Sequence, residues 1–262
     1  MAEQLQENEL HIRNVSKIYP LEKENIQVLE DINLDIKPGE FVSIVGSSGC
    51  GKSTLLKLII GLEKASSGEI DVGTRKVEKP IADVGMVFQE ARLYPWLTIE
   101  KNIRFGIPKD VPKSEHEKKI QEHIDLVGLT GFENAYPAQL SGGMQQRASI
   151  ARALVGKPKV LLLDEPFGAL DAFTRINMQN EVLRIWEHEK RTMVLVTHDI
   201  DEAIFLSDRI VILSERPGKI KEIIPVKLSR PRDRSNNLFL EIRKKILTSF
   251  LGNSELNIEY YI

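Results

Sequence analysis

The clearest candidate for chemistry is a short glycine-rich segment near residue 50. It fits the pattern G-x-x-x-x-G-K-[ST] in full, through the residues Gly46, Ser47, Ser48, Gly49, Cys50, Gly51, Lys52 and Ser53. Glycines allow the backbone to fold around phosphate groups, so that several N–H groups and a helix N-terminus face the anion. Lys52 is expected to reach the β- and γ-phosphates, and the Ser53 hydroxyl to bind Mg²⁺. The segment predicts a nucleoside triphosphate site and by itself leaves GTPases, kinases and ATPases open.

The residues on either side supply the context that this loop requires. An apolar run over 41–45 is expected to form a strand before it, and a helix is expected to start near Lys52 and end at Gly61. Thr54, in the first turn of that helix, joins the predicted phosphate site. Cys50 is the single cysteine, which excludes an internal disulfide. Because it lies within the loop, its alkylation is expected to place bulk in the phosphate site and inhibit hydrolysis, with a buried, inert thiol as the alternative.

A pair of acidic residues follows a short apolar run later in the chain. Residues 160–163 read Val-Leu-Leu-Leu, which predicts a buried central strand, and Asp164 and Glu165 come directly after it. In an open parallel sheet the carboxyl end of such a strand faces the ligand crevice, beside the phosphate loop. Asp164 is expected to hold Mg²⁺ through a water molecule, and Glu165 to act as general base toward the attacking water.

The rest of the chain indicates one α/β protein with covered parallel strands. Strands are expected at 69–72, 84–88, 160–164, 193–197 and 210–213, and helices at 174–189 and 201–206, with helical character from 99 to 156. The composition is that of a globular protein, with 42% hydrophobic residues, 28% charged residues and a net charge of −2, which gives no reason to expect nucleic acid as a partner. No apolar run reaches the length of about 18 residues that a membrane span needs.

A second glycine-containing segment resembles the signature of the ATP-binding cassette (ABC) ATPases. Residues 140–147 read Leu-Ser-Gly-Gly-Met-Gln-Gln-Arg, with Met144 where the family most often has Gln. Ser141, Gly142 and Gly143 precede a helix-like stretch and would form a second anion site from a hydroxyl, backbone N–H groups and a helix dipole. Since the phosphate loop already serves one nucleotide, this second site is expected to meet the γ-phosphate bound by a partner subunit.

Four further residues match family elements in the expected order. The resemblance implies that Gln89 contacts Mg²⁺ and the attacking water, and that His198 hydrogen-bonds the γ-phosphate. It also implies that Asp171, within Ala169-Leu170-Asp171, crosses a dimer interface and that Tyr19 stacks on adenine. Taken singly, an isolated His or Gln would more often be an ordinary polar residue, and for Tyr19 the alternative is an aromatic residue of an edge strand that needs no ligand.

The resemblance covers residues 10–225 and implies the overall design. We expect an α/β fold of the P-loop NTPase (ABC ATPase) type, with an antiparallel β lobe and an inserted helical lobe at about 90–156, in a single ATP-binding domain. The working unit would be a head-to-tail homodimer that binds ATP and Mg²⁺ at its interface. The C-terminal extension, about 226–262, carries apolar residues at helical spacing, which predicts a terminal helix packed on the core, with a lid or partner-binding helix as the alternative.

The segment after Gln89 indicates which branch of the family is most similar. Residues 92–98, which include Tyr94 and Trp96, resemble the importers of nitrate, sulfonate, taurine and bicarbonate. In such importers this stretch receives a helix from a separate membrane permease, and a solute-binding protein takes part indirectly. The resemblance thus implies a peripheral subunit on the cytoplasmic face of the membrane. The alternative for residues 92–98 is a loop packed on its own domain, with Trp96 as a core residue.

Two other classes of protein could carry a similar phosphate loop, but they fit the rest of the sequence less well. Soluble ABC ATPases that act on DNA or ribosomes usually carry two cassettes, coiled-coil insertions or basic arms, and the chain has none of these. A GTPase would normally show the guanine-recognition pattern N-K-x-D, and no Asn-Lys dipeptide occurs. A transport ATPase therefore remains the preferred function, with another class of solute as an open alternative.

Overall fold

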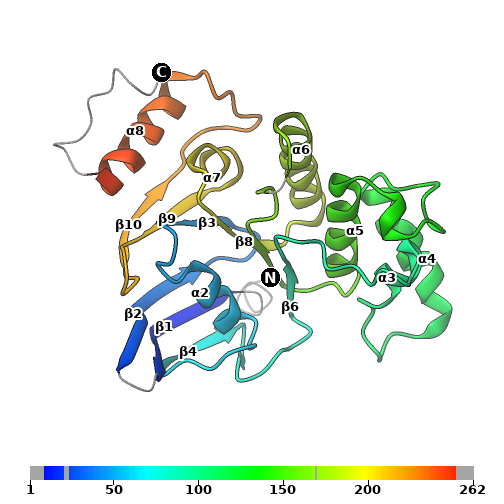
Figure 1. Cartoon of the computed structure of the whole chain (residues 1–262), viewed down its shortest axis with the longest axis horizontal. Coiled ribbons are helices and arrows are strands. Elements are labelled where there is room, and N and C mark those ends of the chain that lie inside the picture. Colours follow the sequence, from blue (N-terminus) through cyan, green and yellow to red (C-terminus); the bar gives the residue numbers. More distant parts are fainter. Residues whose placement is uncertain (1–8, 21–23, 169, 252–262) are drawn as a thin grey trace.

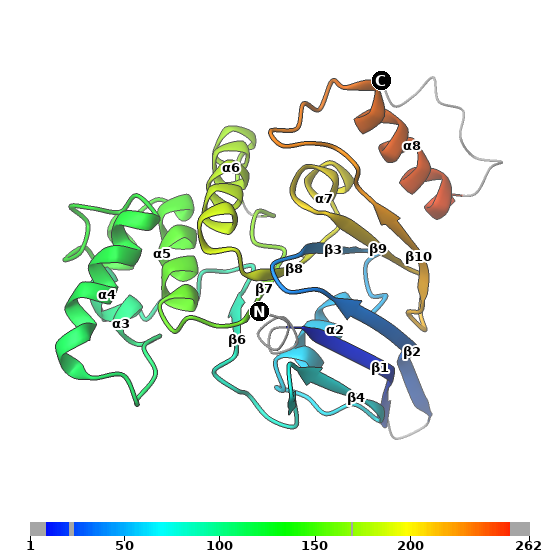
Figure 2. The same cartoon turned by 180° about the vertical axis from the view of Figure 1, so that it is seen from behind.

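The structure is a computed structural model that describes residues 9–20, 24–168 and 170–251. It contains two β-sheets and a set of helices that lie mostly on one side of the larger sheet (Figure 1). Seen from behind, the smaller sheet lies below the larger one at the right, and the helices coloured green extend to the left (Figure 2). The predicted α/β class is confirmed.

The smaller sheet is antiparallel and has the strand order β2-β1-β4-β5. Its strands are β1 (Leu10–Pro20), β2 (Asn25–Ile36), β4 (Ser67–Val72) and β5 (Arg75–Lys76). Alternating residues of β1 and β2 are buried, as expected for a sheet with one face on a core. This sheet is the antiparallel β lobe that the resemblance implied.

The larger sheet has the order β10-β9-β3-β8-β7-β6. Its strands are β3 (Phe41–Val45), β6 (Val84–Val87), β7 (Val160–Asp164), β8 (Thr192–Thr197), β9 (Arg209–Leu213) and β10 (Ile220–Pro225). All neighbours are parallel except β10, which pairs antiparallel with β9. Strand β10 was not among the elements that the sequence predicted, because its mixed apolar and charged residues suit an edge strand or a loop equally well.

Both faces of the larger sheet are covered, which explains why its strands are apolar without alternation. Helix α2 (Lys52–Ile59) lies between the two sheets, and its leucines share one core with Val42 and Ile44 of β3. On the other face, Phe41 and Val45 belong to a second core with α6 (Ala172–Glu189) and α7 (Ile200–Leu206). The two cores thus use successive residues of the same strand.

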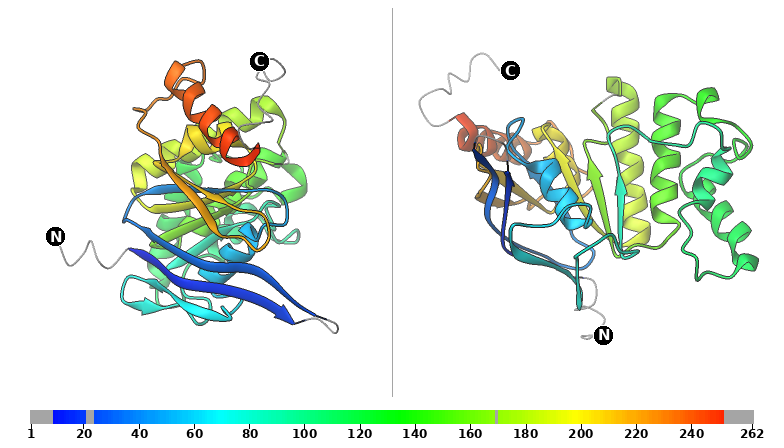
Figure 3. Two further views of the ribbon diagram at one scale, coloured as in Figure 1. Left: turned by 90° about the vertical axis from the view of Figure 1, so that its left-hand side faces the viewer. Right: turned by 60° about the horizontal axis from the view of Figure 1, so that its bottom comes forward.

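The inserted helices lie between β6 and β7 in the chain. They are α3 (Ile99–Arg104), α4 (Lys113–Leu126), the short 3₁₀ helix η1 (Pro137–Gln139) and α5 (Gly142–Leu154). In Figure 3 they form a separate lobe at the end of the molecule remote from β10. These helices fall within the predicted range of about 90–156, whereas the division of the chain into units stays a prediction.

The last described element is α8 (Asn237–Leu251), which packs beside α7 (Figure 1). Phe239, Ile242 and Ile246 are buried in the core of the larger sheet. Arg243 of α8 forms an ion pair with Asp201 of α7. The preferred hypothesis, a terminal helix packed on its own core, is therefore confirmed for this helix, and residues 252–262 lie outside the described residues.

Candidate functional site

The register of the parallel strands brings three loops to one edge of the larger sheet. Strand β8 lies between β3 and β7, with Val45 of β3 opposite Thr197 and Asp164 of β7 opposite Val196. The phosphate loop follows Val45, His198 follows Thr197, and Glu165 follows Asp164. Residues far apart in the sequence are therefore neighbours, because parallel strands end at the same edge.

The phosphate loop leads from β3 into α2. Gly51 is the N-cap residue of the helix and has φ 104°, a backbone conformation that residues other than glycine rarely adopt. The Lys52 ammonium is buried and donates hydrogen bonds to the carbonyl oxygens of Gly46 (2.8 Å) and Ser47 (3.0 Å). The lysine thus spans the loop from inside, where a phosphate would meet both the ammonium and the free N–H groups of the helix N-terminus.

Two oxygen donors suited to Mg²⁺ lie next to the loop. The Ser53 hydroxyl donates to the Asp164 carboxylate at 3.0 Å. Burial, and to a lesser degree the neighbouring Glu165, raise the pKa of Asp164, while the Ser53 hydrogen bond lowers it. Among the described residues no group of three or more His, Cys, Asp or Glu side chains could hold a metal. A hydroxyl with one carboxylate fits Mg²⁺, which takes few protein ligands and completes its shell with waters and phosphates.

Glu165 and His198 form a close polar pair at the edge of the cleft. The His198 Nδ1 atom lies 3.1 Å from a carboxylate oxygen of Glu165. Glu165 has φ 44°, a left-handed conformation that is uncommon for residues other than glycine and often occurs at functional sites. Its N–H group donates to Val196 O at 2.9 Å, so β8 holds this backbone in place. A water molecule between the pair and a bound phosphate could lose a proton to Glu165.

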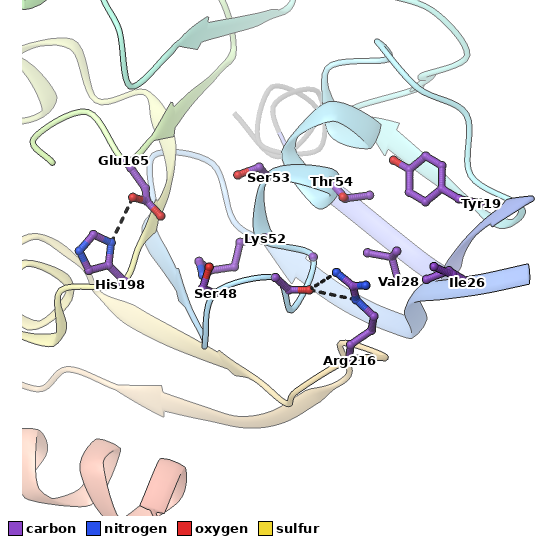
Figure 4. Close-up of a pocket in the computed structure, with 12 residues that line it drawn as sticks. Tyr19, Ile26, Val28, Ser48, Lys52, Ser53, Thr54, Glu165, His198 and Arg216 are labelled. Atoms are coloured by element: carbon purple, nitrogen blue, oxygen red, sulfur yellow. Dashed lines mark hydrogen bonds and ion pairs between the residues drawn. The ribbon is translucent and has the colours of Figure 1, made fainter. Parts of the chain in front are cut away.

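These groups border a cleft of about 840 Å³, shown in Figure 4. The residues that line it are Tyr19, Ile26, Val28, Ser48, Gly49, Gly51, Lys52, Ser53, Thr54, Glu165, His198 and Arg216. Gly46, Ser47 and Cys50 belong to the loop without lining the cleft. The sequence analysis missed Ile26, Val28 and Arg216, since an apolar pair in an edge strand and an arginine in a turn carry no signal of their own.

Tyr19 lies at the far end of this cleft from Glu165 (Figure 4). Its hydroxyl donates to Glu63, and the Lys17 ammonium lies 4.7 Å from the ring centroid. Burial and the hydrogen bond to Glu63 raise the pKa of the Tyr19 phenol. Together with Ile26 and Val28, the ring gives this end an apolar wall against which a base could stack.

Gln89 is exposed and is not one of the residues that line the cleft. It nevertheless lies near the acidic strand end, because β6 runs beside β7. A Cβ atom built on Gly168 would lie 3.4 Å from Gln89 Nε2 and 3.9 Å from a carboxylate oxygen of Glu165. The two side chains therefore border the same glycine.

The signature residues lie in a different cleft of about 350 Å³. Ser141 is the N-cap of α5 and accepts a hydrogen bond from Met144 N at 3.3 Å. Ser141, Gly143 and Met144 line this second cleft, and Gly142 is exposed beside it. No residue lines both clefts, so this chain does not bring its own signature to its own phosphate loop.

Asp171 caps α6 through its carboxylate, which accepts from Phe173 N and Thr174 N, each at 3.1 Å. Hydrogen bonds from Thr174, first its side chain and then its backbone, lower the pKa of Asp171. The carboxylate is exposed and borders neither of the two clefts described above. Ala169, the first residue of this predicted loop, lies outside the described residues.

Cys50, the cysteine of the phosphate loop, is buried. Its side chain is 1% exposed and belongs to the core around α2, so it points away from the phosphate side of the loop. A Cβ atom at Gly46 would lie 2.6 Å from its sulfur. Burial raises the pKa of the Cys50 thiol. Because alkylation needs an accessible thiolate, the folded loop protects Cys50, in agreement with the alternative of a buried, inert thiol.

Residues 94–98 form a loop whose aromatic side chains reach the surface. Trp96 is 70% exposed and Phe105 66% exposed. The Tyr94 ring lies 5.6 Å from the Trp96 ring and 4.8 Å from the Phe105 ring, so the three form one cluster. The alternative in which Trp96 is a core residue is therefore wrong.

A buried amide holds this aromatic loop in shape. The Asn102 side chain accepts from Tyr94 N at 2.7 Å and donates to the carbonyl oxygens of Tyr94, Leu97 and Thr98 at 3.0–3.1 Å. Both the oxygen and the nitrogen of this amide are hydrogen-bonded, and Asn102 is fully buried. Tyr94 and Trp96 are thus presented by a rigid loop, and Phe105 lies beside them at the C-terminal end of α3.

Comparison with known proteins decides the family. The family model described as ABC transporter matches residues 29–168. The aliphatic sulfonates import ATP-binding protein SsuB of Bacillus cereus is 52% identical over 240 residues, which cover 91% of this chain and 94% of that protein. The chain belongs to the ABC transporter ATP-binding proteins. An uncharacterized ABC transporter ATP-binding protein of Methanocaldococcus jannaschii is 50% identical over 91% of this chain and 90% of its own length.

Solved structures agree with this family assignment. A dimeric ABC transporter cassette superposes with a TM-score of 0.73 at 36% identity, covering 84% of this chain and all of the other. A post-hydrolysis dimer bound to ADP and phosphate gives a TM-score of 0.72 at 35% identity, with the same coverage. The predicted ABC ATPase fold and ATP-hydrolysing activity are confirmed. None of the helices in the described part of this ABC subunit is long and apolar enough to cross a membrane.

Proposed function

We propose that this chain is the ATPase subunit of an importer for a small organic anion of the aliphatic sulfonate class. The observation that carries the proposal is the identity of about half of all residues, over nine tenths of the chain, with the sulfonate import ATP-binding proteins of two Bacillus species. Nitrate, taurine and bicarbonate, the other solutes of this branch of the family, are the alternatives to an aliphatic sulfonate.

The nucleotide is assigned to the cleft between Tyr19 and Glu165. Lys52 and the N–H groups at the start of α2 would bind the phosphates, with Ser48 and Thr54 beside them and the base against Tyr19. Ser53 and Asp164 would hold Mg²⁺, with Gln89 close by, and the ion would neutralise phosphate charge. Glu165 would take the proton of the attacking water, and His198 would donate toward the γ-phosphate.

Two chains are assigned to each complete site. The signature cleft around Ser141 is separate from the phosphate loop of the same chain. Gly142, Gly143 and the N-terminus of α5 would therefore contact a nucleotide that the partner chain holds. A head-to-tail dimer supplies it, and Asp171 would then lie at the interface. The dimers formed by the solved ABC cassettes support this arrangement.

The aromatic cluster of Tyr94, Trp96 and Phe105 is the proposed docking site for the membrane permease. Exposed aromatic residues on a rigid loop are typical anchors of protein interfaces. The loop begins a few residues after Gln89, so a change at the nucleotide can be passed to the permease. Docking there would hold the subunit on the cytoplasmic face of the membrane, with a solute-binding protein on the other side.

Uptake in the source organism tests the proposed solute. Deleting the coding region should abolish uptake of a labelled aliphatic sulfonate, and the wild-type chain should restore it. The Glu165→Gln chain, which keeps the fold, should not restore it. If sulfonate uptake survives deletion while uptake of another anion is lost, the solute assignment is overturned and the importer assignment stands. If the deletion changes no solute uptake and a pull-down of the chain recovers no membrane transporter, the importer assignment fails.

A further inference from the structure

An arginine outside every recognised family element contacts the phosphate loop. Arg216 lies in the turn between β9 and β10, and its guanidinium donates to the carbonyl oxygen of Gly49 through Nε (3.2 Å) and Nη2 (3.0 Å). Figure 4 shows this contact at the border of the nucleotide cleft, with Val28 and Ile26 beyond it. We propose that Arg216 is a positioning residue that fixes the orientation of the phosphate loop and thereby sets the affinity for the nucleotide.

The turn that carries Arg216 is itself held against the loop. Gly218 N donates to Val28 O at 2.9 Å, and Glu30 N donates to Gly218 O at 3.0 Å, so the turn pairs with β2. Within the turn, Ser214 N donates to Lys219 O at 2.9 Å, and Lys219 N donates to Ser214 Oγ at 3.0 Å. Arg216 therefore extends from a braced backbone.

The approach between this turn and the phosphate loop is close. A Cβ atom built on Gly218 would collide with the Cys50 carbonyl oxygen, so only glycine fits there. A Cβ atom on Gly49 would lie 3.4 Å from Arg216 Nη2. The guanidinium and the backbone of the turn thus contact the neighbouring residues Gly49 and Cys50 of the loop.

The contact matters because one peptide group of the loop has few other restraints. Gly49 has φ 78°, and the Gly49–Cys50 peptide is otherwise held by a long hydrogen bond of 3.4 Å from Cys50 N to Ser47 O. Peptides next to glycine rotate easily, since glycine tolerates both signs of φ. If the Gly49 carbonyl turned inward, its negative end would face the phosphates. The two N–H groups of Arg216 hold this oxygen toward the turn between β9 and β10.

The chain contains its own probe for the state of this loop. Cys50 is the only cysteine and follows Gly49 directly, so a thiol reagent reports on one position. Because the thiol is 1% exposed, alkylation requires local opening of the loop. Arg216→Gln should raise the rate of Cys50 alkylation by N-ethylmaleimide about ten-fold, the factor expected for losing a hydrogen bond to a charged group. Arg216→Lys keeps the charge and one donor group, and should recover part of the protection.

Nucleotide binding supplies the second measurement, and here the inference rests on the proposed nucleotide site. Arg216→Gln should weaken binding of Mg·ADP about ten-fold and raise the KM for ATP by a similar factor. It should change kcat less than about three-fold, because Glu165 and His198 are untouched. Lys219→Gln is the matched control: this cation lies in the same turn but pairs with Glu30 at 2.7 Å and does not line the cleft. Lys219→Gln should leave both the rate of Cys50 alkylation and the affinity for Mg·ADP within two-fold of wild type.

The possible outcomes are distinct. A faster Cys50 reaction together with weaker Mg·ADP binding, at unchanged melting temperature, supports the positioning role. Weaker binding with an unchanged Cys50 rate would mean that Arg216 acts on the nucleotide by charge alone, and would overturn it. Rates and affinities within two-fold of wild type would overturn it as well. Failure of the wild-type chain to bind Mg·ADP would refute the proposed site, while the Cys50 rates would still decide whether Arg216 restrains the loop.

Discussion

His198 Nδ1 and the Glu165 carboxylate lie 3.1 Å apart at the ends of neighbouring strands, beside the cleft that holds Lys52. The pair places a proton acceptor and a polar side chain where the terminal phosphate would lie. We predict that Glu165→Gln lowers kcat for ATP hydrolysis about 10²–10⁴-fold, because the amide can still hydrogen-bond but cannot take a proton. Its affinity for Mg·ATP should stay within about three-fold of wild type, as measured by nucleotide displacement.

The same variant should accumulate as a dimer with ATP and Mg²⁺ in size-exclusion chromatography, since the nucleotide that joins two chains is not consumed. Lys52→Ala is the comparison and should lose affinity itself, because the buried ammonium within the loop is gone. Near-normal turnover of Glu165→Gln would remove Glu165 from the role of base.

The two tryptophans of the chain offer a matched test of the docking surface. Trp96 is 70% exposed, whereas Trp186 is 8% exposed and donates to Gly39 O at 3.1 Å. Trp96→Ala should change the melting temperature of the isolated subunit by less than about 2 °C, as surface substitutions do. Trp186→Ala should lower stability by about 3–5 kcal/mol, as expected when an aromatic residue is removed from a core.

Co-purification measures the function of the exposed ring. Trp96→Ala should weaken association with the membrane permease about ten-fold or more, because an aromatic anchor at an interface contributes about 2 kcal/mol or more. ATP binding by the isolated variant should be normal. Unimpaired recovery of the permease with Trp96→Ala would locate the docking surface elsewhere.

Complementation between two inactive chains tests the shared site. Lys52 and Ser141 line different clefts of one chain, so a dimer of Lys52→Ala with Ser141→Arg keeps one site with both halves intact. With free exchange and independent sites, an equal mixture should recover up to about one quarter of wild-type hydrolysis. A chain carrying both substitutions is the negative control. If exchange is demonstrated and the mixture is no more active than either parent, sites completed within one chain become the better description.

Glu202 gives a prediction for the pH dependence of stability. It is 4% exposed, its Oε1 atom has no hydrogen-bond partner, and Gln179 Nε2 lies 3.4 Å from its Oε2 atom. Burial, and next the neighbouring Asp199, raise its pKa from 4.5 to about 8. Between these values the folded state binds the proton and the unfolded state does not, so this residue lowers stability as pH rises.

Glu202→Gln removes the titration and keeps the shape. The variant should match wild type near pH 5 and exceed it by about 1–3 kcal/mol at pH 7, with the difference widening toward pH 8. Thermal melting of both proteins across this range measures the effect. A constant difference at all pH values would mean that Glu202 does not hold a proton in the folded state.

The local chemistry of the site was predictable because it depends on residues that are contiguous in the chain. The loop from Gly46 to Ser53 contains its own turns, its lysine and the start of its helix, and the apolar run 160–163 forces Asp164 to a strand end. Glu165 was predictable in the same way, because it follows Asp164 at that strand end, whereas His198 could be assigned only with the help of family resemblance. Their contact is non-local, since it depends on β8 lying beside β7.

Tertiary structure decided whatever depended on which side a residue faces or which distant segment covers it. Cys50 lies in a phosphate-binding sequence, yet its side chain turns into the core around α2. Trp96 could have been core or surface, and the hydrogen bonds of Asn102 settle it by shaping the loop outward. Arg216 had no signal at all, because its partner is a backbone carbonyl 167 positions away. Sequence patterns report local preference and burial, whereas such contacts arise only when strands from different parts of the chain are packed together.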